Sequence, residues 1–230
     1  MIRVFIGYDP RESQVYHVLS QSIIDKTSVP VAITPLHHDM LRGFDGQQDG
    51  TNAFIYSRFL VPELAGYDGW ALYMDSDMLL RDDLVKLWDM IDPSKAAMVV
   101  KHDYETTHTR KFVGTPLEAP NAHYPRKNWS SLILWNCGHP VNTCLTRDFV
   151  SSAGGAVLHR FSWMDDSLIG EIPEEWNHLV GEFEYNENAA NAHFTLGAPT
   201  FFHYRHCDYS GEYMQTLRRV NHMEGGEWRS

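Results

Sequence analysis

Short apolar runs recur along the chain, and between them lie stretches in which apolar residues return every three or four positions. The first pattern is typical of buried strands, and the second is typical of amphipathic helices. The apolar runs predict strands at 3–7, 29–36, 71–74, 96–101 and 131–136. The helical spacing predicts helices at 11–24, 53–64, 82–90 and 209–221. This alternation predicts an α/β fold, an α/β/α sandwich around a mostly parallel, mixed central sheet.

Two long segments show neither period. Residues 37–52 are polar and rich in glycine, and residues 103–128 are rich in Thr, His, Pro and Gly. A long irregular insert in a compact domain is more often functional than structural. No internal repeat or linker-like break divides the 230 residues, so we expect a single domain spanning 1–230.

Composition excludes several classes of function. The formal net charge is −11 and no basic run is longer than Arg218-Arg219, so we expect no nucleic-acid partner. No apolar run approaches the length of a transmembrane segment, and Met1 leads almost directly into a strand instead of a signal peptide. Three cysteines without C-x-x-C spacing predict reduced thiols and a cytoplasmic location.

Candidate chemistry begins where the apolar run 71–74 ends, at Asp75-Ser76-Asp77. Ligands of open α/β sheets bind beyond the carboxyl ends of the strands. Two carboxylates there offer hard oxygen ligands for Mg²⁺ or Mn²⁺, which can in turn hold a diphosphate. Asp and Ser are also common turn residues, so the three residues alone are compatible with a simple turn. Their place at the end of a buried strand favours the metal site.

Several further motifs follow one another between residues 4 and 204. In order they are Gly7-Tyr8-Asp9, Tyr56-Ser57-Arg58, Asp75-Ser76-Asp77, the run 130–136, Asp165-Asp166, and 193–197. Their order and separation resemble those of nucleotide-sugar glycosyltransferases of the GT-A fold, and most closely the retaining family-8 type. The resemblance implies transfer of a hexose from a nucleoside diphosphate, with UDP-glucose or UDP-galactose as first candidates, to a glycan or small-molecule acceptor. It also implies a Rossmann-like nucleotide-binding half, about 1–102, and a sugar and acceptor half, about 103–230.

By resemblance, Asp75, Asp77 and His193 are the metal ligands, and the imidazole favours Mn²⁺ over Mg²⁺. The other residues that the resemblance places at the donor are Gly7, Tyr8, Asp9, Arg58, Ser76, Trp129, Ser131 and Gly197. Tyr8 suits stacking on the base, and Asp9 could accept a hydrogen bond from it or from the ribose. Each has a plainer alternative: residues 7–10 as a turn, Arg58 as a solvated charge, His193 as a loop histidine.

The resemblance places Asp165 beneath the sugar ring and Asp166 on its hydroxyl groups. Asp165 could act as a nucleophile, or the reaction could proceed by front-face attack, and the sequence favours neither. The alternative is that these acids cap a helix. A phosphatase of the haloacid-dehalogenase type, with Asp75 as nucleophile, is a competing interpretation, although its motif normally lies on the first strand. A non-catalytic protein that binds nucleotide or glycan on the same fold is another.

One departure from the family concerns the diphosphate. The family often follows its histidine with a glycine and then a lysine that grips the phosphates, whereas residues 198–202 contain no lysine. Phosphate neutralisation would then fall to Arg58, to His203, Arg205 or His206, or to the metal and backbone amides alone.

Overall fold

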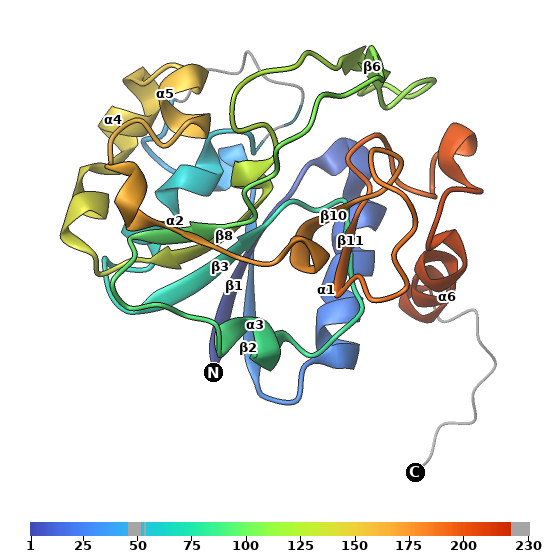
Figure 1. Ribbon diagram of the computed structural model, residues 1–230, viewed down its shortest axis with the longest axis horizontal. Helices are drawn as coiled ribbons and strands as arrows, with labels where there is room; N and C mark the ends of the chain where they lie inside the picture. The colour runs from blue at the N-terminus through green and yellow to red at the C-terminus, as the bar shows by residue number, and fades with distance from the viewer. Residues whose placement is uncertain (46–51, 53, 222–230) are drawn as a thin grey trace.

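The computed structural model describes residues 1–45, 52 and 54–221. Positions 46–51 of the predicted loop and position 53 of a predicted helix lie outside these residues. The central sheet has the strand order β2-β1-β3-β8-β5-β9 (Figure 1). Its strands are β1 (Ile2–Gly7), β2 (Val31–Leu36), β3 (Trp70–Met74), β5 (Ala97–Val99), β8 (Leu132–Asn136) and β9 (Ile169–Glu171). Only β8 runs against the other strands of this sheet, which confirms the mostly parallel, mixed sheet.

Helices cover both faces of this sheet, as Figure 1 shows. They are α1 (Ser13–Lys26), α2 (Val61–Leu64), α3 (Leu84–Trp88), α4 (Arg147–Ser152), α5 (Gly155–His159) and α6 (Ser210–Val220). Because successive strand residues point to opposite faces, Tyr73 and Trp135 pack toward α2, α4 and α5, whereas Leu72 and Leu134 pack toward α1 and α3. Both faces are therefore buried, and the predicted α/β/α sandwich is confirmed.

Helix α1 ties the sheet to the region that follows β3. Its buried residues repeat at helical spacing and are Val15, Val18, Leu19, Ser22 and Ile23. Val15 and Val18 share a cluster with Tyr213 of α6, so α6 packs on the side of α1 away from the central sheet. The buried Ser22 hydroxyl accepts a hydrogen bond from the amide of Leu80 at 3.0 Å. This bond fixes the strand that comes after the Asp75-Ser76-Asp77 turn.

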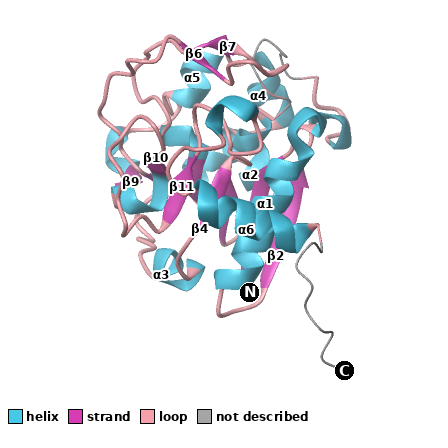
Figure 2. Ribbon diagram, turned by 90° about the vertical axis from the view of Figure 1, so that its right-hand side faces the viewer, coloured by secondary structure: helices cyan, strands magenta, loops and turns pink. Residues whose placement is uncertain are grey.

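A second, smaller sheet has the order β10-β11-β4 (Figure 2). It consists of β4 (Met78–Leu80), β10 (His178–Leu179) and β11 (Asn191–His193). Strand β11 is antiparallel to β4, with His193 opposite Met78. Strands of two or three residues carry no readable hydrophobic period, so the sequence did not predict this sheet. It nevertheless joins the segment after β3 to the C-terminal part of the chain.

The predicted helix at 53–64 is wrong over its first part. The chain forms a turn of 3₁₀ helix at Ser57–Leu60 and then the short α2. Side chains take up the backbone carbonyls before it: the Ser57 hydroxyl donates to Phe54 O at 3.0 Å, and Arg58 Nε donates to Ile55 O at 2.9 Å. Such local bonds compete with helical hydrogen bonding. The other three predicted helices and all five predicted strands are present, within two residues at each end.

The irregular segment 103–128 contains a hairpin of two short strands, β6 (Arg110–Lys111) and β7 (Ala119–Pro120). Strand β8, from the second predicted half of the chain, lies between β3 and β5 from the first, so the two halves share one sheet. Across residues 1–45, 52 and 54–221, no helix has both the length and the apolar character that a bilayer crossing requires.

Candidate metal centre

The structure brings together the three residues predicted as metal ligands. Strand β3 delivers Asp75 and Asp77 at its carboxyl end, and the pairing of β11 with β4 delivers His193. The amide of Phe194 donates to Asp77 O at 2.8 Å and fixes this register. One ligand atom from each of the three side chains lies within 4.8 Å of the others. Two carboxylates and an imidazole in this arrangement fit a divalent transition-metal ion.

A chain of hydrogen bonds orients His193. The Ser131 hydroxyl donates to Asn128 O at 2.7 Å, so its oxygen accepts from Asn177 Nδ2 at 2.9 Å. The amide oxygen of Asn177 then faces His193 Nδ1 at 2.9 Å. This network assigns the imidazole proton to Nδ1. Nε2, which lies 3.3 Å from Asp77 Oδ1, is therefore left with its lone pair facing the acids. Metal-binding histidines are commonly oriented in this way.

Asp75 is held by a buried cation. Arg58 Nη1 lies 3.0 Å from Asp75 Oδ1, and the Tyr73 hydroxyl donates to the same oxygen at 2.6 Å. Burial raises the pKa of Asp75, and the charge of Arg58 opposes this shift. Arg58 is 4% exposed and also donates to Ser130 O at 2.8 Å. Its hydrogen bonds thus go to the protein, which differs from the solvated charge considered as an alternative.

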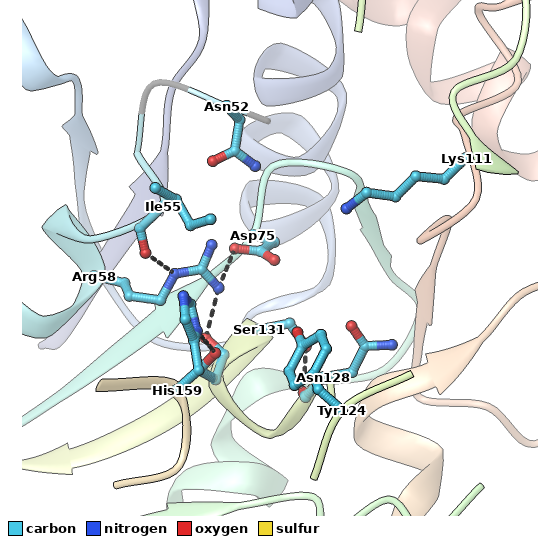
Figure 3. A pocket seen from close by; sticks show the side chains of 10 residues that line it. Asn52, Ile55, Arg58, Asp75, Lys111, Tyr124, Asn128, Ser131 and His159 are labelled. Atoms are coloured by element: carbon cyan, nitrogen blue, oxygen red, sulfur yellow. Dashed lines mark hydrogen bonds and ion pairs between the residues drawn. The ribbon is translucent and has the colours of Figure 1, made fainter. Parts of the chain in front are cut away.

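A cavity of about 190 Å³ opens beside Asp75 (Figure 3). The side chains around it come from five separate parts of the chain. They are Asn52, Ile55, Arg58, Asp75, Lys111, Tyr124, Asn128, Ser130, Ser131 and His159. Lys111 reaches in from the β6–β7 hairpin, with its ammonium pointing toward Asp75 (Figure 3). Burial lowers the pKa of Lys111, although Asp77 and Asp75 favour its charge.

Glu12 adds a further acid close to this cluster. It is 7% exposed, and its Oε2 has no hydrogen-bond partner within the described parts of the chain. Burial and the neighbouring charges of Asp77, Asp9 and Asp75 raise the pKa of Glu12 to about 9. Glu12 is therefore protonated at neutral pH while no cation is bound. The sequence offered no sign of this residue, because it precedes a helix as many surface acids do.

The residues predicted to contact the nucleotide lie at the end of β1. The Tyr8 ring packs edge-on against Tyr16 at 5.3 Å and His37 at 5.7 Å. Asp9 is 1% exposed, and it accepts from the Arg11 amide and from Arg11 Nε, both at 2.9 Å. Gly7 abuts the Phe54 ring, where a Cβ would lie 2.2 Å from a ring carbon. Contact of Asp9 with a base would thus require exchange with Arg11.

Ser76 lies between Asp75 and Asp77 in the sequence, and Gly197 lies in the segment after His193. Ser76 is fully buried. Gly197 has a φ of 151° and lies under the Tyr204 ring, where a Cβ would be 2.3 Å from a ring carbon. Only glycine fits this position, because both the backbone conformation and the close ring exclude a side chain.

The structure does not bring Trp129, Asp165 and Asp166 into the cavity beside Asp75. Trp129 lines a neighbouring cavity and donates its indole N–H to His102 O at 2.9 Å. Asp165 is exposed and caps a 3₁₀ turn by accepting from the Ser167 amide at 2.9 Å, which matches the capping alternative. Asp166 is exposed and pairs with Arg126 at 2.6 Å.

Sequence reasoning missed Lys111, Asn177 and His159. Asn177 follows a proline-led acidic stretch that reads as a surface turn, yet the residue is fully buried. His159 ends α5, and its Nδ1 lies 2.7 Å from Ser130 Oγ. Only the irregular composition of 103–128 pointed to the neighbourhood of Lys111, without indicating the residue.

A relative of known sequence shows the family of this chain. No protein-family model matches the chain. Protein CDI of Arabidopsis thaliana is 40% identical over 230 residues, a match that covers 95% of this chain and 87% of that protein. The chain belongs to the family of Protein CDI.

Solved structures identify the fold. The bifunctional glycosyltransferase WbbM has a TM-score of 0.67 at 13% identity, with 99% of this chain covering half of that longer chain. The galactosyltransferase LgtC, in complex with donor and acceptor sugar analogues, has a TM-score of 0.59 at 12% identity, covering 95% of this chain and 96% of LgtC. GlyE of Streptococcus pneumoniae TIGR4 has a TM-score of 0.61 at 10% identity, and the match covers 94% of this chain and 60% of GlyE. The chain has the GT-A glycosyltransferase fold.

His159 should make stability depend on acid pH. Burial, together with the charges of Arg58 and Lys111, lowers the pKa of His159 from 6.5 to about 3. The unfolded chain binds a proton that the folded chain does not, so stability should fall as pH drops from 6.5 toward 3. Between pH 7 and pH 5 this one group should account for about 1–2 kcal/mol of the loss. Urea denaturation in chelator should show a smaller loss for His159→Gln. His123→Gln, at an exposed histidine, is the control and should lose as much stability as wild type. If His159→Gln also loses as much stability as wild type between pH 7 and pH 5, His159 is not the group responsible.

Asn177 should control metal affinity. Asn177→Leu removes the acceptor that fixes His193 Nδ1–H, so Mn²⁺ affinity should fall about 10–100-fold. Electron paramagnetic resonance of free Mn²⁺ measures this directly, without any turnover.

The matched control is Asn142→Leu, which changes another fully buried asparagine, one that donates to Ala96 O at 2.8 Å. It should lower stability without changing Mn²⁺ affinity. Equal Mn²⁺ affinities for Asn177→Leu and Asn142→Leu would rule out the orienting role.

Proposed function

We propose that this protein is a metal-dependent glycosyltransferase that moves a hexose from a nucleoside diphosphate to a glycan or small-molecule acceptor. The observation that carries the proposal is the grouping of Asp75, Asp77 and His193 within 4.8 Å, at the carboxyl end of β3. In open α/β sheets this is where ligands bind. UDP is the proposed nucleotide, UDP-glucose and UDP-galactose are the first donors to test, and retention of configuration is the proposed outcome.

The proposed ion is Mn²⁺, because the ligand set includes an imidazole nitrogen and Mg²⁺ prefers oxygen ligands alone. Mg²⁺ is the alternative. Asp75 and Asp77 would hold the ion through carboxylate oxygens and His193 through Nε2. When bound, such an ion supplies a Lewis acid that neutralises charge on a departing diphosphate. Arg58 keeps Asp75 in place through their 3.0 Å ion pair, and Asn177 keeps the lone pair of His193 aimed inward.

The cavity beside Asp75 is the proposed sugar site. Its volume of about 190 Å³ is below the roughly 300–1,000 Å³ of pockets that enclose whole ligands. It therefore suits one part of the donor, the hexose with the phosphate groups attached to it, better than a complete nucleotide sugar. Ser131 contributes one wall, while Gly7, Tyr8, Asp9, Ser76 and Gly197 are the proposed contacts of the nucleotide along the edge of the sheet.

Asp165 and Asp166 remain proposed residues of the sugar site, with one condition. Asp165 would have to release the amide of Ser167, and Asp166 the guanidinium of Arg126, before either could face a donor sugar. The cytoplasmic location also remains a prediction. Cys137, Cys144 and Cys207, all within the described ranges, are free thiols.

Asp77→Asn should lower transfer or donor hydrolysis more than about 100-fold, because several kcal/mol of charge stabilisation depends on the ion. Release of UDP from UDP-glucose and UDP-galactose, with and without Mn²⁺, measures the effect. Asp89→Asn, at the exposed acid that directly follows α3, is the control. Wild-type turnover that is indifferent to chelator, or that persists in Asp77→Asn, would remove the metal from the proposal.

Asp75→Ala is a less informative variant, because it should also weaken the fold. Removing Asp75 leaves the charge of Arg58 buried without its partner, which costs about 3–5 kcal/mol for a buried ion pair. Thermal denaturation should therefore separate the two variants, with Asp75→Ala melting well below Asp77→Asn. Equal melting temperatures would show that the 3.0 Å pair contributes nothing to stability.

A further inference from the structure

Lys111 brings an unneutralised charge into the cavity. Its ammonium makes no hydrogen bond and no ion pair with the residues that the structure describes. It lies 5.2 Å from the centre of the Phe112 ring. Lys127, from the same irregular segment, is by contrast fully engaged, with Nζ 2.6 Å from Asn121 Oδ1 and 2.8 Å from Ala122 O. Lys111 is half-buried, and an ammonium that has lost part of its hydration without gaining a partner is unfavourable, so its retention points to a ligand.

The segment that follows His193 holds the hairpin of Lys111 in place. The amide of Phe112 donates to Leu196 O at 2.6 Å, and the amide of Val113 donates to the Tyr204 hydroxyl at 2.9 Å. Gly114 lies against the His203 ring, where a Cβ would be 2.5 Å from a ring carbon. The backbone that carries the histidine ligand thus also positions the ammonium across the cavity.

The cations suggested by the sequence are occupied elsewhere. Arg58 is paired with Asp75. His203 packs on Gly114, and Arg205 lies over the exposed Phe202 ring at 4.2 Å with its Nε 3.1 Å from His206. Among the described residues that line the cavity, Arg58 and Lys111 are the permanent cations, and only Lys111 is unpaired.

We propose that Lys111 binds the phosphate groups of the donor in the cavity that it lines together with Asp75. This inference rests on the proposed function and assigns the missing phosphate cation to the β6–β7 hairpin instead of the segment after His193. An ammonium is a compact charge with three donors, which suits phosphate oxygens. The acids across the cavity repel an anion unless a divalent cation accompanies it, so Lys111 and the metal would act on the diphosphate together.

Isothermal titration calorimetry with UDP and uridine, each in the presence of Mn²⁺, tests this role. Lys111→Met should weaken UDP binding at least about tenfold, the effect of losing a hydrogen bond to a charged group. Uridine binding should change less than about threefold, because uridine carries no phosphate. Lys86→Met, at an exposed lysine of α3 paired with Asp82, removes the same charge far from the cavity and should leave both affinities unchanged.

The two proposals fail in different ways. A wild-type protein that binds no UDP in the presence of Mn²⁺ would overturn the proposed function. A wild-type protein that binds UDP, with equal affinity in Lys111→Met, would overturn the role of Lys111 alone. Equal losses for UDP and uridine would assign Lys111 to the shape of the site, and would also overturn it. If Lys111→Met fails to fold, Lys111→Gln replaces it with the same expected result.

Discussion

The pairing of β11 with β4 is the constraint on which the candidate site depends. It sets His193 opposite Met78 and lets the amide of Phe194 bond to Asp77 O at 2.8 Å. The strands are too short to hold this register by themselves, and buried polar bonds supply what they lack. Ser22 receives the amide of Leu80 at 3.0 Å, and Asn191 donates to Trp176 O at 3.0 Å. Loss of this register would separate the imidazole from the acids while leaving the central sheet intact.

The central sheet could be predicted because its signals are local. Residues 71–74 form an apolar run that is buried on both faces, and this pattern alone predicts a strand inside the sheet. The small sheet could not be predicted, since two or three residues define no period. The same limit explains Asn177: burial of a single amide is a property of the fold, and nothing in its neighbours along the chain announces it.

Charged residues were harder to place, because one residue pattern serves several roles. Arg58 is predicted to lie over the donor; the structure places it in the wall of the cavity, where it also bonds to Asp75 and Ser130 O. Asp165 precedes a turn, and an acid in that position serves equally well as a cap or as a residue of a sugar site. Which role applies depends on where the turn lies relative to β3, and that follows from the packing of α4 and α5 on the sheet. Motif order identified the fold without fixing these distances.

The balance of charge around the cavity narrows the kind of ligand that it can hold. Asp77 and the nearby Glu12 are acids with which Arg58 forms no ion pair. Burial, and after it the charges of Asp77, Asp9 and Asp75, raise the pKa of Glu12 to about 9. The ammonium of Lys111 points toward Asp75 (Figure 3) but forms no ion pair with an acid among the residues that the structure describes. An anion alone would meet the acids, and a cation alone would meet the ammonium. A ligand that satisfies both walls combines the two signs, as a divalent ion with a diphosphate does. A half-buried charge left unpaired, like that of Lys111, is expected where function, not stability, has selected it.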